Sequence, residues 1–148
     1  APPVYLGWGS MMAGAPENTA LLAVRTLMKV GVRGVILGGW AKLNVAMLEG
    51  QPDSAAMKAY CENNVLFVHA APHEALFPRC AVVVHHGGAA TTACSLRSGV
   101  TTIITPVFMD QFPNADMVQR NGVGLRLRPL PKVSVAELSR GLRRCLDD

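Results

Sequence analysis

Charged and aromatic residues are both scarce in this sequence, and it has no long apolar run. Only 16% of the 148 residues are charged and 5% are aromatic, whereas 50% are hydrophobic, which excludes intrinsic disorder. The mean hydropathy is +0.26, but no apolar run approaches the roughly 18 residues that span a bilayer, so we expect no integral membrane segment. The cysteines, Cys61, Cys80, Cys94 and Cys145, form neither a CxxC pair nor a tight framework. We expect reduced, mostly buried thiols in a cytoplasmic protein.

Signals for secretion and for nucleic-acid binding are also missing. Residues 1–4 contain no basic segment followed by an apolar one, so no secretory signal is predicted. Because an initiator methionine is absent too, we expect a piece of a longer protein or a processed product. The net charge of +4 mildly favours an anionic partner. The arginines that come nearest to a basic cluster are Arg140, Arg143 and Arg144. They suit the solvent-facing end of a helix, so no nucleic-acid partner is predicted.

The chain length fits one domain covering residues 1–148. Short apolar runs predict strands at residues 4–6, 32–37, 65–68, 81–84, 102–105 and 125–127. Longer amphipathic runs predict helices at residues 16–30, 54–61, 74–77, 88–98, 114–121 and 134–146. This alternation predicts an α/β fold, a Rossmann-like doubly wound parallel sheet of about six strands. In such sheets ligands bind beyond the carboxyl ends of the strands.

The strongest motif follows the fourth predicted strand, in the run from His85 to Thr92. A buried strand leads through Gly87 and Gly88 directly into a helix, whose first N–H groups attract anions. A histidine and two threonines add hydrogen-bond donors. We interpret the run as a pyrophosphate cradle; the alternative is tight strand–helix packing around a satisfied core histidine.

Two further loops at the same predicted edge carry polar groups. The segment Gly7 to Met12 has two glycines of the dinucleotide fingerprint, but Met12 replaces the third. It is either a plain turn or a turn that presents backbone amides and the Ser10 hydroxyl to a phosphate. After the fifth strand, Asp110 and Gln111 offer the acceptors and donors that suit vicinal sugar hydroxyls. The alternative for Asp110 is a helix N-cap.

Metal binding is not predicted, although the chain has four histidines. His69 and His73 are four residues apart, but Pro72 lies between them and argues against a helix that would place both on one face. Adjacent His85 and His86 would point to opposite sides of a continuing strand. The cysteine spacing supports no zinc site.

Taken together, these segments resemble the C-terminal, donor-binding domain of GT-B glycosyltransferases of family 1. The resemblance is strongest to sterol glucosyltransferases and bacterial antibiotic glycosyltransferases. It covers residues 3 to about 127 and is carried by residues 4–11, Gly38-Gly39-Trp40, residues 72–78, the run from 85 to 92, Gly99-Val100, Pro106-Val107-Phe108 and Asp110-Gln111.

The resemblance implies a role for each motif. It implies diphosphate contacts from Gly9, Ser10, His86, Gly88, Ala89, Ala90 and Thr91. It implies that Trp40 and the backbone from Ala71 to His73 hold the uracil, and that Asp110 and Gln111 hold the sugar. The implied donor is UDP-glucose or another UDP-hexose, used in an inverting displacement without metal or cofactor. Three departures affect this site: Ala90 stands where relatives have glycine, Thr101 replaces a proline, and Cys94 lies where plant relatives place a ribose-binding acid.

The resemblance also implies a missing half. In this family an N-terminal acceptor domain supplies the acceptor pocket and the catalytic base, so no catalytic residue is assigned here. We expect an enzyme whose acceptor is a sterol or another lipophilic hydroxyl, with this chain alone binding the donor without turnover. The full protein would be cytoplasmic, with membrane association through the missing part.

Three other functions compete with this interpretation. The chain could be the donor-binding subunit of a split GlcNAc transferase that joins a membrane partner. It could be a non-catalytic nucleotide-binding or interaction module, although intact His86, Asp110 and Gln111 argue against a decayed site. A nicotinamide dehydrogenase is disfavoured because the fingerprint breaks at Met12 and no acidic ribose ligand follows the second strand.

Overall fold

Six parallel strands form one sheet in the order β3-β2-β1-β4-β5-β6. The computed structural model describes residues 1–9, 11 and 13–148. The strands are β1 Val4–Leu6, β2 Gly34–Leu37, β3 Val65–Val68, β4 Val82–His85, β5 Thr101–Ile104 and β6 Gly124–Arg126. The chain order reverses between β1 and β4, which pair in register from Val4 with Val82 to Leu6 with Val84. The predicted doubly wound sheet is confirmed, and its ligand site is expected beside this switch point.

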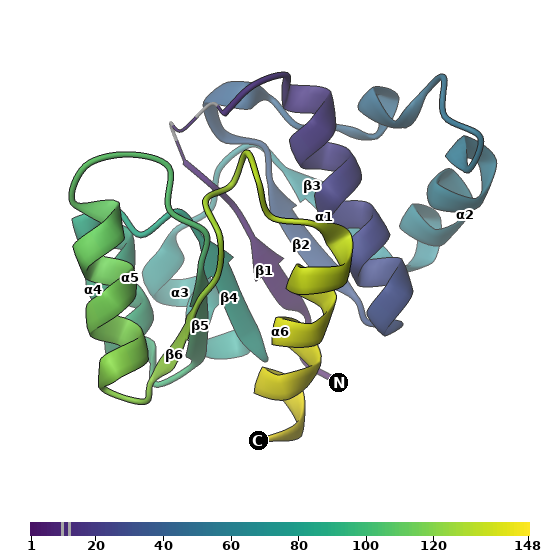
Figure 1. The fold of residues 1–148 in the computed structure, drawn as a ribbon. Coiled ribbons are helices and arrows are strands. Elements are labelled where there is room, and N and C mark those ends of the chain that lie inside the picture. Colours follow the sequence, from purple (N-terminus) through teal and green to yellow (C-terminus); the bar gives the residue numbers. More distant parts are fainter. Residues whose placement is uncertain (10, 12) are drawn as a thin grey trace.

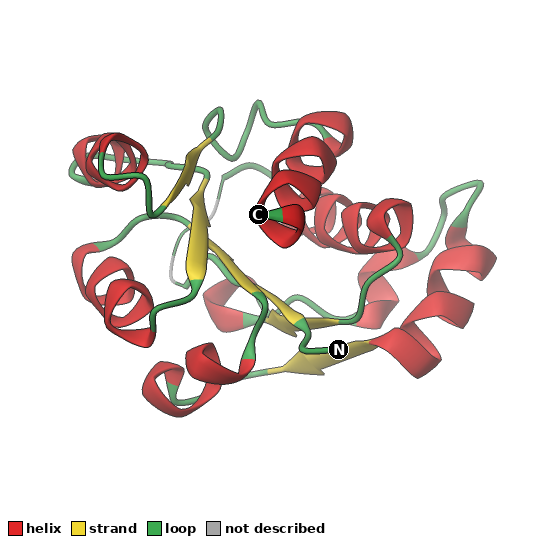
Figure 2. Ribbon diagram, turned by 90° about the horizontal axis from the view of Figure 1, so that it is seen from below, coloured by secondary structure: helices red, strands yellow, loops and turns green. Residues whose placement is uncertain are grey.

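Helices cover both faces of the sheet (Figure 2). They are α1 Pro16–Val30, α2 Ser54–Asn64, α3 His73–Leu76, α4 Ala89–Ser98, α5 Gln111–Arg120 and α6 Val135–Asp147. Short 3-10 helices lie at η1 Gly39–Ala41, η2 Val45–Leu48 and η3 Phe77–Arg79. On one face α1 packs against α6 and α2, and on the other α4 packs against α3 and α5. Both chain termini lie at the end of the sheet opposite the loops after β1, β2 and β5 (Figure 1).

The longest helices form where the sequence predicts them. α1 begins with Pro16 at its first position and ends at Gly31, which adopts the left-handed conformation that closes a helix. The Ser-x-x-Glu pattern of residues 134–137 predicts a capping box at the start of α6. The hydroxyl of Ser134 accepts a hydrogen bond from the backbone N–H of Glu137 at 3.1 Å, as predicted, but the Glu137 carboxylate accepts hydrogen bonds from Arg128 instead of closing the box. Leu138 and Leu142 on the inner face of α6 are fully buried.

Several predicted boundaries are wrong by one to three residues. β2 begins at Gly34 rather than at residue 32, because the backbone N–H groups of Gly31 and Val32 still bond to the carbonyl of Leu27. β4 extends to His85, so the first histidine of the pair belongs to the strand. α5 begins at Gln111 rather than at residue 114. Pro113 is compatible with this start, because the first-turn N–H groups of a helix have no intrahelical partner.

The core has one part on each face of the sheet. Toward α1 and α6 the buried side chains include Leu6, Leu27 and Val84. Toward α3 and α4 they include Tyr5, Phe77 and Val83. This double cover explains why β1 is apolar throughout and why β4 is apolar until His85, its last residue. All four cysteines are free thiols, and Cys61, Cys80 and Cys94 are buried as predicted.

Candidate functional site

The loops after the central strands begin from adjacent positions at the carboxyl edge. The backbone N–H of Gly7 donates to the carbonyl of Val84 at 3.1 Å, and that of Thr105 donates to the carbonyl of His85 at 3.0 Å. These bonds carry the sheet ladder one residue beyond β1 and β5. The residues that follow each strand are therefore held side by side, as the parallel topology predicts.

The imidazole of His86 lies between two glycines from different loops. A Cβ atom on Gly88 would lie 2.6 Å from Nε2 of His86, and one on Gly9 would lie 3.2 Å from Cε1. Gly9 also has a φ of +59°, which disfavours any other residue. His86 is 8% exposed. Burial lowers its pKa and outweighs the opposite influence of the Asp110 carboxylate, so the ring is neutral near pH 7.

The N-terminus of α4 opens beside this imidazole. Gly88 is its N-cap residue and the backbone N–H of Thr92 makes the first helical bond, to the Gly88 carbonyl at 2.8 Å. By helix geometry the N–H groups of residues 89–91 have no intrahelical acceptor. Ala89 and Ala90 are exposed. The structure thus brings Gly9, His86 and the first turn of α4 together into a site suited to an anion.

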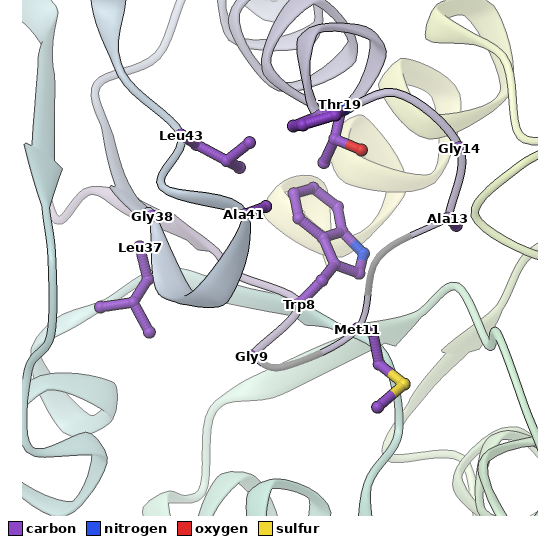
Figure 3. A pocket seen from close by; sticks show the side chains of 11 residues that line it. Trp8, Gly9, Met11, Ala13, Gly14, Thr19, Leu37, Gly38, Ala41 and Leu43 are labelled. Carbon is purple, nitrogen blue, oxygen red and sulfur yellow. The ribbon is translucent and has the colours of Figure 1, made fainter.

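The β1 loop is anchored by Trp8, which is a structural residue. Its side chain is 3% exposed and its Nε1–H donates to the Thr105 hydroxyl at 2.8 Å. Figure 3 shows the indole directed toward Thr19 of α1, between Leu43 and the segment that contains Ala13 and Gly14. The cavity left there is only about 10 Å³, too small for a ligand.

The predicted phosphate loop after β1 is described only in part. Ser10 and Met12 lie outside the described residues, so the hydroxyl contact assigned to Ser10 stays a prediction. Among the described residues of this loop, the backbone N–H of Met11 donates to the Trp8 carbonyl at 2.9 Å.

A wider pocket of about 500 Å³ adjoins Gly9. It is lined by Gly9, Leu37, Gly39, Trp40, Lys42, His69, Ala70 and Ala71. The structure therefore brings Trp40 and Ala71, both assigned to uracil, to one pocket. Trp40 is 78% exposed, and its backbone N–H donates to the Gly9 carbonyl at 3.3 Å. Gly39 must be glycine here because a Cβ would collide with that carbonyl.

Two polar residues of this pocket, Lys42 and His69, have no binding role among the sequence-based predictions. Lys42 follows η1 with a left-handed φ of 54°, and His69 lies just beyond β3. Each residue follows a strand or a glycine loop, and that position could have indicated a binding role. That the two residues line the same pocket depends on how two separate loops fold.

His73 does not line this pocket, because its ring is engaged in the core below. Its Nε2 lies 3.2 Å from the Tyr5 hydroxyl, and its ring stacks on Phe77 with centroids 4.6 Å apart. Burial lowers the pKa of His73, and burial raises that of Tyr5. The protonated phenol and the neutral imidazole therefore share one hydrogen bond, which anchors the segment that carries Ala71.

Asp110 and Gln111 lie next to each other but differ in availability. Asp110 is exposed and occupies the N-cap position of α5, yet its side chain bonds to no backbone N–H among the described residues. Gln111 is 4% exposed. Its Oε1 accepts from the backbone N–H groups of Val107 and Phe108, both at 2.9 Å, and its Nε2 donates to the sulfur of Met11 at 3.2 Å.

Metal ligands are not grouped in this structure. Among residues 1–9, 11 and 13–148, no three His, Cys, Asp or Glu side chains come close enough together to hold an ion. The rings of His85 and His86 are nearly perpendicular, with centroids 6.2 Å apart. His69 is exposed on its loop, while His73 begins α3 after Pro72.

The family model for the C-terminal domain of proteins like erythromycin biosynthesis protein CIII matches residues 44–148. The chain belongs to this EryCIII-like family. The resemblance to the C-terminal domain of family 1 glycosyltransferases is thereby confirmed.

Curated relatives of the EryCIII-like domain include sterol glucosyltransferases. The chain is 38% identical over 143 residues to the sterol 3-beta-glucosyltransferase UGT80B1 of Arabidopsis thaliana, covering 97% of this chain and 22% of the relative. It is 37% identical over 139 residues to the sterol 3-beta-glucosyltransferase of Aspergillus fumigatus, covering 94% of this chain and 9% of the relative. The EryCIII-like domain thus spans less than a quarter of either protein.

Solved glycosyltransferases share the fold of the EryCIII-like domain. The glycosyltransferase VinC in complex with DTDP matches 100% of this chain and 34% of its own, with a TM-score of 0.71 and 25% identity. The UDP-glucose: anthocyanidin 3-O-glucosyltransferase in complex with UDP matches 99% of this chain and 32% of its own, with a TM-score of 0.79 and 20% identity. The predicted GT-B C-terminal architecture is confirmed. Within the described part of the domain, no helix is both long and apolar enough to cross a membrane.

Proposed function

We propose that this chain is the nucleotide-sugar-binding domain of an inverting hexosyltransferase that transfers glucose from UDP-glucose to a sterol or another lipophilic hydroxyl. The observation that carries the proposal is the position of His86. Its imidazole lies between Gly9 and Gly88, at the open N-terminus of α4 and beside the Trp40 pocket. Neutral hydrogen-bond donors beside a pocket wide enough for a nucleoside support the binding of a diphosphate that links a nucleoside to a sugar.

The diphosphate would bind to N–H groups. The first-turn amides of residues 89–91 and the neutral imidazole of His86 would donate to its oxygens. When the acceptor oxygen attacks the anomeric carbon, the bond from that carbon to the β-phosphate breaks and negative charge grows on the departing UDP. Donors already aimed at that charge stabilise it more in the transition state than in the bound donor.

The base and ribose would occupy the 500 Å³ pocket beside Gly9. Trp40 offers an exposed aromatic surface for the uracil, and the backbone from Ala71 to His73 offers hydrogen bonds to its edge. The Tyr5–His73 contact supports this by fixing the segment from below. Lys42 and His69 line the same pocket and would border the nucleotide.

The sugar would contact Asp110 and Gln111. The Asp110 carboxylate is exposed and uncommitted to the α5 cap among the described residues, so it can accept hydrogen bonds from two vicinal hydroxyls. The Gln111 oxygen already accepts two backbone N–H groups. We therefore assign to Gln111 only a donor role toward the sugar, through Nε2.

The acceptor site and the catalytic base would lie in an N-terminal domain or partner subunit. The small share of the sterol glucosyltransferases that the chain spans supports this. The exposed side chains of Phe108 and Met109, which directly precede Asp110, would face the lipophilic acceptor. The complete protein would act in the cytoplasm, with any membrane association through its other part.

Calorimetric titration of the chain with UDP, UDP-glucose and NAD tests the proposal. We expect UDP and UDP-glucose to bind and NAD not to bind. His86→Ala should weaken UDP about tenfold or more, since a hydrogen bond to a charged group is worth roughly 1.5–3 kcal/mol. Far-UV circular dichroism would show whether the variant is folded. The absence of UDP binding at millimolar ligand, or equal binding by His86→Ala, would refute the proposal.

A further inference from the structure

Gly87, between His86 and Gly88, has both of its backbone polar groups bound to side chains rather than to secondary structure. Its N–H donates to Nδ1 of His85 at 3.0 Å, and its carbonyl accepts from Nδ2 of Asn114 at 2.9 Å. We propose that His85 and Asn114 are positioning residues, which clamp Gly87 so that His86 and the first turn of α4 meet the diphosphate. The inference rests on the proposed function and assigns roles to two residues outside the predicted site.

The clamp acts on the two peptide planes that flank Gly87. The N–H belongs to the plane shared with His86, and the carbonyl belongs to the plane shared with Gly88. Together the two planes define the φ and ψ angles of Gly87, whose φ is +92°. Glycine has the widest conformational freedom of any residue, so without the two bonds nothing local would hold these angles. Fixing both planes sets the direction of the His86 side chain and of the Gly88 N–H.

No other residue type fits at position 87. A Cβ there would lie 2.8 Å from Cγ2 of Ile104 and 3.1 Å from the carbonyl oxygen of Gln111. Glycine is therefore required at this position by the close contacts and by the positive φ. Neighbouring residues must then restrict its conformation. His85 does so from the end of β4 and Asn114 from the first turns of α5.

The bond to His85 fixes the tautomer of that ring. Nδ1 can accept only when it is unprotonated, so the proton of the neutral ring is on Nε2. His85 is fully buried, and burial, with smaller contributions from His86 and His73, lowers its pKa to about 3. The acceptor is therefore preserved throughout the neutral range. Nε2 is buried without a partner among the described residues, which costs free energy. If the side chain served only to fill space, an apolar residue would avoid this cost.

The orientation of Asn114 follows from the same argument. A backbone carbonyl can only accept, so the Nδ2 group of Asn114 must face Gly87. The backbone N–H of Asn114 bonds to the Asp110 carbonyl at 3.1 Å, which holds the residue in α5. The clamp thus couples the start of α5, which also carries Gln111, to the start of α4.

The clamp predicts a selective defect. The Trp40 pocket is built by the loops after β1, β2 and β3 and does not include Gly87. Losing either clamp bond should therefore weaken contacts to the diphosphate and leave contacts to the nucleoside intact. The ratio of UDP affinity to uridine affinity is a measure that general destabilisation would not change.

Four variants of this chain test the inference. His85→Leu removes the acceptor with similar volume, whereas His85→Asn places Oδ1 where Nδ1 was. Asn114→Ala removes the donor, and Asn64→Ala is a matched control, since Asn64 likewise donates from Nδ2 to a backbone carbonyl, that of Tyr60 at 3.0 Å. Calorimetry would measure UDP binding and ligand-observed NMR would measure uridine binding.

We expect the Kd for UDP to rise about tenfold in His85→Leu and Asn114→Ala, a loss typical of one hydrogen bond, with the Kd for uridine unchanged. His85→Asn should stay within about threefold of the parent chain. Asn64→Ala should match the parent chain. Unchanged UDP affinity in both His85→Leu and Asn114→Ala, or equal losses for UDP and uridine, would overturn the inference.

Hydrogen exchange of the Gly87 amide separates the clamp from the proposed function, because it needs no ligand. We expect protection in the parent chain and in His85→Asn, and exchange at least about tenfold faster in His85→Leu. Equal exchange in all three would overturn the clamp whatever UDP does. If exchange behaves as expected but the parent chain binds no UDP, the proposed function fails and the bond from His85 to Gly87 stands.

Discussion

The indole N–H of Trp8 donates a 2.8 Å hydrogen bond to the hydroxyl of Thr105, and the bond joins the loop after β1 to the end of β5. β4 lies between these two strands, so the bond crosses above the strand that leads to His86. A second bond joins the same two regions, from Nε2 of Gln111 to the sulfur of Met11 at 3.2 Å. The loops on either side of His86 are therefore fixed to each other as well as to the sheet.

Removing either partner of the buried Trp8–Thr105 bond should destabilise the fold. We expect Trp8→Phe and Thr105→Val each to lower the free energy of unfolding by about 1–3 kcal/mol, because each leaves a buried polar group or a small void. The double variant should lose less than the sum, with a coupling of about 1 kcal/mol. Urea unfolding at neutral pH would measure all four proteins. Strict additivity would show that the bond contributes nothing.

Adding a methyl group at Gly88 should abolish the arrangement around His86 without unfolding the protein. The φ of Gly88 is −60°, which alanine tolerates, but its Cβ would lie 2.6 Å from Nε2 of His86. The ring must turn away, so we expect Gly88→Ala to weaken UDP about tenfold or more, an effect similar to loss of the His86 hydrogen bond. Calorimetry gives the Kd.

The matched control for this variant is Gly141→Ala, in α6. Its Cβ would meet the flexible ends of two side chains, Leu127 at 3.2 Å and Leu125 at 3.6 Å, and alanine favours helix by up to about 1 kcal/mol over glycine. UDP binding should be unchanged there. Equal loss of UDP binding in both variants would point to general disruption rather than to the His86 ring.

Substitutions of Asp110 and of Gln111 should have different effects, the first on sugar binding and the second on stability. Because Asp110 is exposed and does not cap α5 among the described residues, Asp110→Ala should weaken UDP-glucose about fivefold or more while leaving UDP affinity and stability unchanged. Gln111→Leu should instead lower the free energy of unfolding by about 2 kcal/mol or more, because it leaves the N–H groups of Val107 and Phe108 without their acceptor. Parallel titrations and urea unfolding would measure both. Equal losses of UDP and UDP-glucose in Asp110→Ala would contradict the sugar assignment.

The protein should lose stability on mild acidification. His85 has a folded pKa of about 3 against an ordinary value of 6.5, so the unfolded chain binds a proton over a range where the folded chain does not. The stabilisation is fully present above about pH 6.5 and is lost as the pH falls toward 3. For His85 alone the loss between about pH 6.5 and pH 5.5 is about 1 kcal/mol. His86 and His73, whose pKa values burial also lowers, act in the same direction.

Urea unfolding at about pH 7.5, 6.5 and 5.5 would measure this dependence. The His85→Asn variant lacks one titrating ring and should show a shallower decline. A parent chain whose stability is constant over this range would contradict the buried, neutral state of His85.

Much of the fold follows from local sequence signals. The Ser134 cap of α6, the Pro16 start of α1 and the Gly31 stop all act within a few residues, and the structure confirms these three signals. The apolar strand before His85 indicates burial on both faces, which the sheet order confirms. These features are visible in the sequence because their physical causes are local.

The contacts that shape the site were not predictable in the same way. Trp8 and Thr105 are 97 residues apart, and Met11 and Gln111 are 100 apart. Its residue type, its position after the fifth strand and the family resemblance all predict that Gln111 contacts the sugar, and none of them indicates the bonds that bury it. The earlier start of α5 places its side chain back under the preceding loop, and no periodicity indicates that.

The residues assigned to the diphosphate are glycines, alanines, Ser10, Thr91 and a histidine whose pKa burial lowers. None carries a formal charge near neutral pH, so this cradle holds an anion by N–H dipoles. Mobile ions screen exposed charge pairs strongly but affect short, partly buried hydrogen bonds much less. Lys42, at the edge of the nucleoside pocket, is the lysine assigned near UDP, so the affinity for UDP should depend only weakly on ionic strength, and high-salt washing during purification should leave most of the bound nucleotide in place.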